Sequence, residues 1–246
     1  TQNDADQEIT EDTKAIQVYT EMIESLGDHT ADNDSTLLKA FLLLQEMERS
    51  DVDMDLPCYH ALLKICARAG DFERAQRVVQ KLNYNNKPND TTWRLLLRST
   101  QTIQQADSVW KNALSSYHDD HSRLEFWKPS VESFVALLSA YMKAAEEDPT
   151  VYGRIVNLYR SIADGNDTSF GMDRLSLASV NANFKAMLWV LQAVIAVERL
   201  EQGNDISRFE LRRLAVSIAR LDCFKTKLSD NKATRLTLQK ARSWAK

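Results

Sequence analysis

The stretch HDDH, from His118 to His121, concentrates the side chains best suited to binding a metal ion. Two histidines three positions apart, with carboxylates between them, could supply part of a zinc coordination sphere. A third ligand and a rigid frame are missing, so a solvated loop in an insertion before Pro129 is the better interpretation. We therefore expect no metal site.

The cysteines and the usual catalytic motifs point away from an enzyme. Cys58, Cys66 and Cys223 form no disulfide framework and leave one cysteine unpaired, which fits a reducing compartment or a fold independent of disulfides. Cys58 and Cys66 have no histidine partner, so we interpret them as small buried residues. No P-loop, G-x-G-x-x-G, H-E-x-x-H or G-x-S-x-G motif occurs. We expect no catalytic activity, no cofactor and no small-molecule substrate.

The composition favours helix throughout the chain. Its 246 residues include only 6 glycines and 4 prolines, too few for many tight β-turns. The longest apolar run, Met187 to Val197, is interrupted by Gln192 and is too short to span a bilayer. We expect it to form a fully buried helix, and we expect no membrane span.

Five segments begin with an aromatic residue followed by two apolar residues three and four positions later. The aromatic residues are Tyr19, Tyr59, Trp93, Phe134 and Phe184, separated by 40, 34, 41 and 50 residues. Each segment has the spacing of an amphipathic helix that packs on a neighbour. A period in the mid-thirties, lengthened by loop insertions, is typical of stacked helical hairpins.

The segment from Tyr59 to Asp90 is the clearest single hairpin. Gly70 can adopt the left-handed conformation that ends its first helix, and Asp71 can cap the second. Ala75 is small enough for two antiparallel helices to cross closely. One such hairpin cannot bury its apolar face alone, so the pattern predicts a stacked array.

These residues resemble the pentatricopeptide repeat family. The stretches PCYHALL and CARAGDFERA match most of the family's pattern, and KPNDTTWRLL and KPSVESFVALL resemble two junctions between repeats. The tetratricopeptide repeat is the alternative, because GDFERA would suit it equally. The long proline-terminated loops and the aromatic residue at the start of each segment favour the pentatricopeptide interpretation. The resemblance implies an all-α, right-handed α-solenoid of about five degenerate hairpins with C-terminal capping helices.

The resemblance also implies where single-stranded RNA would be read, at one base per repeat. In the family, the base is chosen by the residue after the opening aromatic and by the last residue of the loop. These pairs are Thr20 with Asp55, His60 with Asn89, and Arg94 with Ser130, while Val135 and Lys185 occupy the first position in later repeats. Only Thr20 with Asp55 matches a combination that the family uses, and Val135 cannot hydrogen-bond a base edge. We therefore expect repeats that keep the helical scaffold but lack the residues that choose a base.

Basic residues could still hold the RNA backbone. Arg68 and Lys143 match a position where the family places a phosphate-facing lysine. The remaining candidates for phosphate contact are Lys64 and Arg98, near the same face by helical spacing, and Arg208, Arg212 and Arg213 in the C-terminal segment. The alternatives are ordinary solvated residues and, for the C-terminal segment, a helix that closes the array.

Charge is distributed unevenly along the chain. Residues 1–55 contain 15 acidic and 3 basic residues, whereas residues 206–246 contain 11 basic and 3 acidic residues. Such a chain could present its C-terminal end to a polyanion, although solvated helix faces would look the same. We expect an acidic leader over 1–10, a helical repeat array over 11–225 and a basic capping helix over 226–246.

Two functions fit these expectations. The first is a mitochondrial RNA-associated protein that acts in RNA maturation or translation, mainly through contacts with the RNA backbone and shape. The second is a non-catalytic scaffold, such as a peripheral subunit of a mitochondrial ribosome or another large mitochondrial assembly. The partners would be RNA, recognised with weak sequence specificity at most, or proteins of a mitochondrial ribonucleoprotein.

Overall fold

A computed structural model describes residues 11–28, 33–82, 87–120, 123–165, 175–200, 206–226 and 232–245. The chain forms two compact units, Thr1–Thr100 and Gln101–Lys246, and each is described by itself. Unit 1 contains α1 (Glu11–Asp28), α2 (Asn33–Arg49), α3 (Leu56–Ala69), α4 (Phe72–Gln80) and α5 (Asp90–Ser99). Unit 2 contains α6 (Ile103–Ser115), β1 (Tyr117–Asp120), β2 (Arg123–Phe126), α7 (Val131–Ala144), α8 (Val151–Asp164), α9 (Leu177–Ala182), α10 (Phe184–Arg199), α11 (Arg208–Ala219), α12 (Cys223–Thr226) and α13 (Lys232–Ser243).

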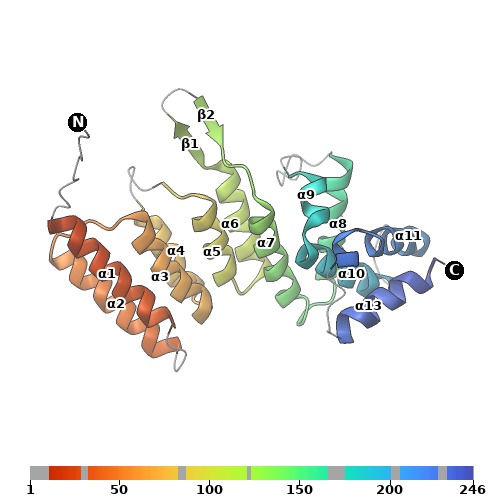
Figure 1. The fold of residues 1–246 in the computed structure, drawn as a ribbon, viewed down its shortest axis with the longest axis horizontal. Helices are drawn as coiled ribbons and strands as arrows, with labels where there is room; N and C mark the ends of the chain where they lie inside the picture. The colour runs from red at the N-terminus through yellow and green to blue at the C-terminus, as the bar shows by residue number, and fades with distance from the viewer. Residues whose placement is uncertain are drawn as a thin grey trace, which may run out of the picture. The chain divides into compact units, whose positions relative to one another are not determined.

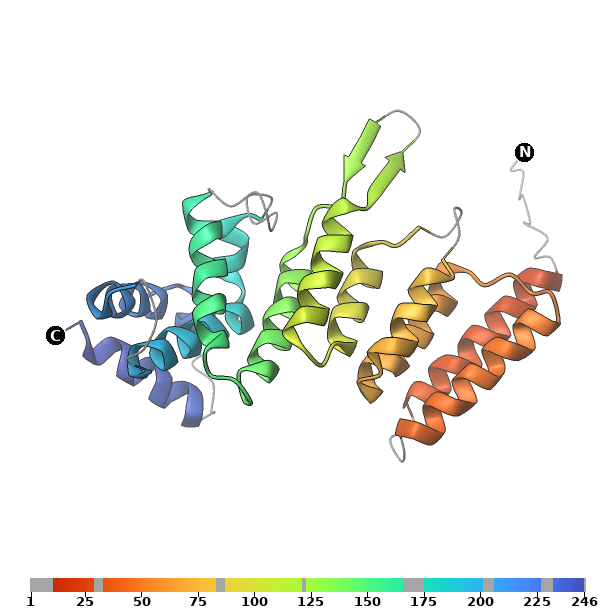
Figure 2. The same ribbon diagram turned by 180° about the vertical axis from the view of Figure 1, so that it is seen from behind.

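Unit 1 is built around α3. Helices α1 and α2 form an antiparallel pair, and α3 packs against both of them as well as against α4 and α5 (Figure 1). Seen from the other side, α3 and α4 form the next antiparallel pair (Figure 2). Leu62 and Leu63 of α3 are fully buried in this packing. Burying one such side chain stabilises the fold by about 1.5–3 kcal/mol.

The turn between α3 and α4 follows directly from its sequence. Gly70 ends α3 with a φ of 70°, a left-handed conformation that costs glycine little because it has no Cβ. Asp71 begins α4 by accepting a hydrogen bond from the backbone N–H of Arg74. Ala75 is fully buried. All three features were predicted from the sequence and are confirmed.

Unit 2 is organised around α10, which contacts α7, α8, α9, α11 and α13. Figure 1 shows α10 lying among these helices, with α13 beside it. Met187, Val190 and Val194 are fully buried, but Trp189, Gln192 and Ala196 are half-buried, so the fully buried helix predicted for the apolar run is confirmed only in part. No described helix is both long and apolar enough to cross a membrane.

A short antiparallel hairpin interrupts unit 2 between α6 and α7. Strands β1 and β2 pair Tyr117 with Phe126 and Asp120 with Arg123. The sequence predicted a plain loop here, and that prediction was wrong for the backbone of His118, Asp119 and Asp120, which belong to β1. His121 lies outside the described residues. The predicted all-α helical-repeat fold is confirmed around this hairpin.

Candidate RNA-facing surface

The pair His60 and Asn89, assigned by resemblance to base reading, is joined within unit 1 by a third residue. The side chain of Thr92 is fully buried, and its Oγ1 lies 2.9 Å from His60 Nε2. Thr92 Oγ1 also accepts a hydrogen bond from the Asn89 backbone N–H at 3.1 Å and donates one to Asn89 Oδ1 at 3.2 Å. Asn89 Oδ1 in turn accepts the Thr92 backbone N–H at 3.1 Å, which completes a capping box at the start of α5.

This network holds the imidazole in place. Thr92 Oγ1 hydrogen-bonds both His60 Nε2 and the Asn89 side chain. Burial, with additional repulsion from Lys64 and Arg94, lowers the pKa of His60 below its ordinary value of 6.5. His60 and the oxygen of Asn89 are therefore engaged in holding α3 against α5.

The other loop-end residues of the base-reading pairs also cap helices. Asp55 accepts the Cys58 backbone N–H at 2.9 Å at the start of α3. Ser130 accepts the Ser133 backbone N–H at 3.0 Å at the start of α7, in unit 2. Each bond satisfies a backbone donor that the helix itself cannot pair. The position that the family uses for reading bases serves here to begin the next helix.

The residues that follow the opening aromatic of each repeat lie in different environments. The Thr20 hydroxyl donates to the carbonyl of Ile16 one turn earlier in α1 at 2.9 Å. Arg94 is half-buried, and its Nε is enclosed without a hydrogen-bond partner among the described residues. In unit 2, Val135 is half-buried, and Lys185 lies exposed with its Nζ 4.6 Å from the centre of the Trp189 ring. In the described residues, the side chains of Thr20, His60, Asp55, Asn89 and Ser130 all make hydrogen bonds within the protein.

The basic residues of unit 1 follow two rows on adjacent helices. His60, Lys64 and Arg68 recur every four residues on α3, and Arg94 and Arg98 have the same spacing on α5. Lys64 pairs with Glu24 of α1 at 3.1 Å, which offsets its charge. Arg68 and Arg98 are exposed and make no ion pair with any described residue. These two guanidinium groups are available to an anion.

The candidate residues of unit 2 are more strongly engaged. Lys143 donates a hydrogen bond to Gln101. Arg212 forms an ion pair with Glu198 at 2.6 Å, and its guanidinium lies 5.6 Å from the centre of the Trp244 ring. Arg208 and Arg213 are exposed on α11. The structure therefore does not gather the predicted phosphate contacts of unit 2 into one free group.

Two functional relationships were not predicted from the sequence. Thr92 was not singled out, although an asparagine three positions before a threonine at a predicted helix start is a recognisable capping signal. The Arg212 partner, Glu198, lies 14 positions away on another helix, and no local pattern indicates it. Groups of three or more possible metal ligands do not occur among the described residues.

Comparison with known proteins now identifies part of the chain. Residues 42–99 match the pentatricopeptide repeat domain family. This stretch contains pentatricopeptide repeats. This match confirms the resemblance to the family that the PCYHALL and CARAGDFERA stretches indicated. Helices α3, α4 and α5 all lie within the matched residues. No curated protein matches the sequence.

Proposed function

We propose that this pentatricopeptide repeat protein binds single-stranded RNA through its phosphate backbone, along the surface formed by α3 and α5. The observation that carries the proposal is the pair Arg68 and Arg98, two exposed arginines without ion-pair partners inside the matched domain. Arg94 lies one turn before Arg98 and gives α5 a second positive charge. Guanidinium groups match phosphate well because their donors are planar and paired.

Recognition of the backbone suits these repeats better than recognition of bases. Base reading needs polar groups directed at base edges, whereas His60 and Asn89 are tied to Thr92. The Asn89 amide nitrogen and the second carboxylate oxygen of Asp55 have no hydrogen-bond partner among the described residues, so each can still make one polar contact with a base. We expect a weak preference among sequences and a strong dependence on salt.

The family match also supports a proposal for the cellular role. Pentatricopeptide repeat proteins are mostly organellar, so we place this one in mitochondria, in RNA maturation or translation. It would act there without catalysis, by holding or protecting a transcript. The Arg68 and Arg98 surface supports such a role because it offers charge and shape without a catalytic group.

The decisive experiment is a titration of the full chain with fluorescent single-stranded RNA over a range of salt concentrations. Each phosphate contact on a single strand contributes about 0.7 to the slope of log affinity against log salt. The double variant Arg68→Gln with Arg98→Gln should lower that slope by about 1.4. Homopolymers of different bases should bind with similar affinities.

The matched control removes two cations from the other helices of unit 1. Arg49 of α2 and Arg77 of α4 are exposed, and the variant Arg49→Gln with Arg77→Gln carries the same net charge as the test variant. Its salt slope should equal that of the unmodified chain. Equal slopes for both double variants would show that net charge, and not this surface, attracts the RNA.

The second candidate is the non-catalytic scaffold within a mitochondrial ribosome or another large assembly. A specific observation favours it: Val18 and Met22 on α1 and Leu38 and Leu42 on α2 are 45–59% exposed. Met22 and Leu42 also line a cavity of about 380 Å³ between these helices. Exposed apolar groups gathered in one place favour contact with another protein. Leu38→Glu with Leu42→Glu should abolish co-sedimentation with the assembly and leave RNA affinity unchanged.

A further inference from the structure

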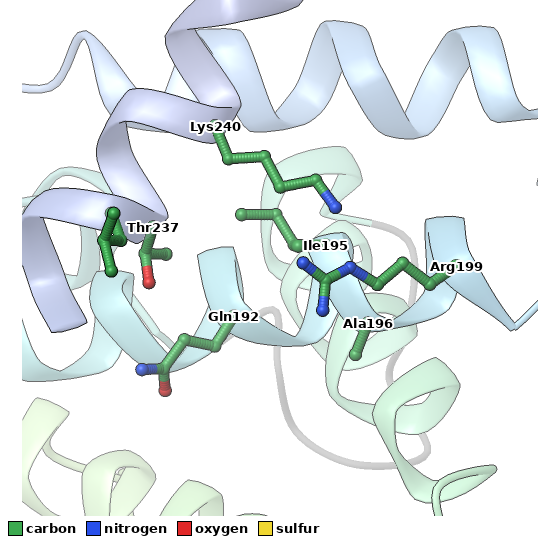
Figure 3. Close-up of a pocket in the computed structure, with 7 residues that line it drawn as sticks. Gln192, Ile195, Ala196, Arg199, Thr237 and Lys240 are labelled. Atoms are coloured by element: carbon green, nitrogen blue, oxygen red, sulfur yellow. The ribbon is translucent and has the colours of Figure 1, made fainter.

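A groove in unit 2 lies between α10 and α13, apart from the α3 and α5 surface. Its volume is about 250 Å³. Its lining residues are Gln192, Ile195, Ala196 and Arg199 of α10, and Leu236, Thr237 and Lys240 of α13. Figure 3 shows Arg199 of α10 and Lys240 of α13 extending toward the same space, with Ile195 between them and Ala196 below Arg199 in this view. The groove thus combines two cations with an apolar floor.

The charges around this groove do not balance. Arg199, Arg212 and Lys240 are close enough to influence one another, and Glu198 is the carboxylate among them. Glu198 is only 10% exposed and is already paired with Arg212 at 2.6 Å. Arg199 and Lys240 form no ion pair with any residue that the structure describes. Among the residues that the structure describes, therefore, no carboxylate forms an ion pair with either of the two cations of the groove.

Holding these two cations together costs free energy. Burial lowers the pKa of Lys240, and the neighbouring Arg199 lowers it further. The Trp244 ring, centred 5.4 Å from Lys240 Nζ, compensates only in part because a cation–π contact is weaker than an ion pair. Arg199 also lies in the last turn of α10, where the helix end supplies at most about half a negative charge. An anion bound between the two side chains would relieve this repulsion.

We propose that the groove between α10 and α13 binds a phosphate monoester of the nucleotide type, with its phosphate between Arg199 and Lys240. A monoester carries a charge of about −1.5 to −2 at pH 7, which matches two cations, whereas an internal phosphodiester carries only one charge. Gln192 lies on the wall beside Thr237, with its amide directed away from Arg199 and Lys240 in Figure 3, so it can donate only to the part of the ligand beyond the phosphate. Ile195 and Leu236 would contact its apolar part.

The size of the groove limits the ligand. At about 250 Å³ it lies below the roughly 300–1,000 Å³ of sites that enclose drug-sized molecules. It accommodates a phosphate and the group directly attached to it, and the remainder of the ligand would extend into solvent. Two sources supply this chemistry, a free mononucleotide and the 5′-phosphorylated end of an RNA.

The experiment compares ligands that differ only in the terminal phosphate. Calorimetry of the full chain with adenosine 5′-monophosphate and with adenosine tests the free nucleotide. Binding of a short oligoribonucleotide with a 5′-phosphate or with a 5′-hydroxyl tests the RNA end. We expect the phosphorylated member of at least one pair to bind at least about tenfold more tightly, since hydrogen bonds to charged groups contribute this much.

Variants locate the effect in the groove. Arg199→Gln and Lys240→Gln should each reduce the advantage of the phosphorylated ligand by about tenfold or more. The control is Arg242→Gln, which removes an exposed cation from the same helix α13, two positions beyond the groove residue, and should leave the advantage unchanged. Circular dichroism confirms that each variant is folded, and Gln192→Leu provides a test that leaves both cations in place.

The outcomes separate this site from the proposed backbone binding. Equal binding of both members in both pairs, or equal effects of Lys240→Gln and Arg242→Gln, would overturn the groove proposal and leave RNA binding by α3 and α5 untouched. Binding of adenosine 5′-monophosphate that depends on Arg199 would uphold the groove even if no RNA bound the α3 and α5 surface.

Discussion

The two arginines assigned to phosphate contact in unit 1 differ from two ion-paired arginines of unit 2. In unit 1, Arg68 and Arg98 are exposed without ion-pair partners among the described residues. In unit 2, Arg154 pairs with Asp107 at 2.6 Å, and Arg212 pairs with Glu198 at the same distance. Both carboxylates of unit 2 are largely enclosed, with 16% and 10% of their side chains exposed.

This difference changes the meaning of the charge gradient along the sequence. The C-terminal 41 residues carry the largest excess of positive charge, with 11 basic and 3 acidic residues. Counting charges therefore points to that end as the site for a polyanion. The structure shows that Arg212 is neutralised by a carboxylate outside this segment. A cation is available to RNA only if the fold has not already paired it, so composition alone overestimates the C-terminal contribution.

The largest expected effect concerns Asp107, which joins two residues of unit 2. Asp107 accepts hydrogen bonds from the buried Tyr141 hydroxyl and from Arg154. Asp107→Ala should destabilise unit 2 by about 2–3 kcal/mol, because it leaves a buried hydroxyl and a charge without partners. Hydrogen exchange of α6, α7 and α8 measures the change. Glu132→Ala, which removes an exposed carboxylate from α7, should change the exchange little.

The next effect concerns Thr92, the residue that joins the base-reading pair of unit 1. Thr92→Val keeps the shape of the side chain but removes its bonds to His60 and Asn89. It should destabilise unit 1 by about 1–2 kcal/mol, since helix caps are worth this much. Chemical unfolding gives the value, with Thr91→Val as the control. Equal stabilities of the two variants would contradict the structural role of the network.

A smaller effect is expected from the titration of His60. Its pKa is lowered by burial, and Lys64 and Arg94 also disfavour its charged form. His60 therefore binds a proton more readily in the unfolded chain than in the folded chain just below pH 6.5. Its contribution to the unfolding free energy is full above this pH and is lost as the pH decreases through the folded pKa. The unfolding free energy of the chain and of His60→Gln should be compared from pH 7.5 to 5. Parallel curves would show that His60 does not titrate as described.

The smallest effect on stability is expected from the surface that we assign to RNA. Arg68→Gln with Arg98→Gln should change the unfolding free energy by less than about 0.5 kcal/mol, because both side chains are exposed and neither forms an ion pair with a residue that the structure describes. Thermal unfolding without RNA measures this. A loss as large as that of Asp107→Ala would mean that these arginines stabilise the fold, and the contrast between the units would disappear.

Local features of the fold could be predicted from the sequence, whereas long-range pairing could not. Gly70 and Asp71 act within one turn of the chain, so their residue types alone indicate the break between α3 and α4. Of the five aromatic residues in the repeat pattern, Tyr59, Trp93 and Phe134 are buried, whereas Tyr19 and Phe184 are half-buried. The ion pair between Arg212 and Glu198 depends on how α11 packs on α10, and no repeating pattern in the sequence predicts that packing.

The candidate site was predicted in part for the same reason. Arg68 and Arg98 follow from helical spacing and from the resemblance, and their exposure agrees with that placement. The engagement of His60 with Thr92 joins residues 32 positions apart and needs the stacking of α3 on α5. The groove of Arg199 and Lys240 combines two helices that are distant in sequence, so neither residue was singled out.

The buried cysteines determine how the protein can be labelled. Burial raises the pKa of Cys58 to about 11 and that of Cys66 to about 12, and Cys223 is only 8% exposed. At pH 7 only about one Cys58 thiol in ten thousand is ionised, and the thiolate is the form that reacts with maleimides. Cysteines introduced at exposed positions, one in each unit, would therefore accept dyes well ahead of the native thiols. With the native cysteines left in place, fluorescence energy transfer between the two dyes could then be measured while RNA is added.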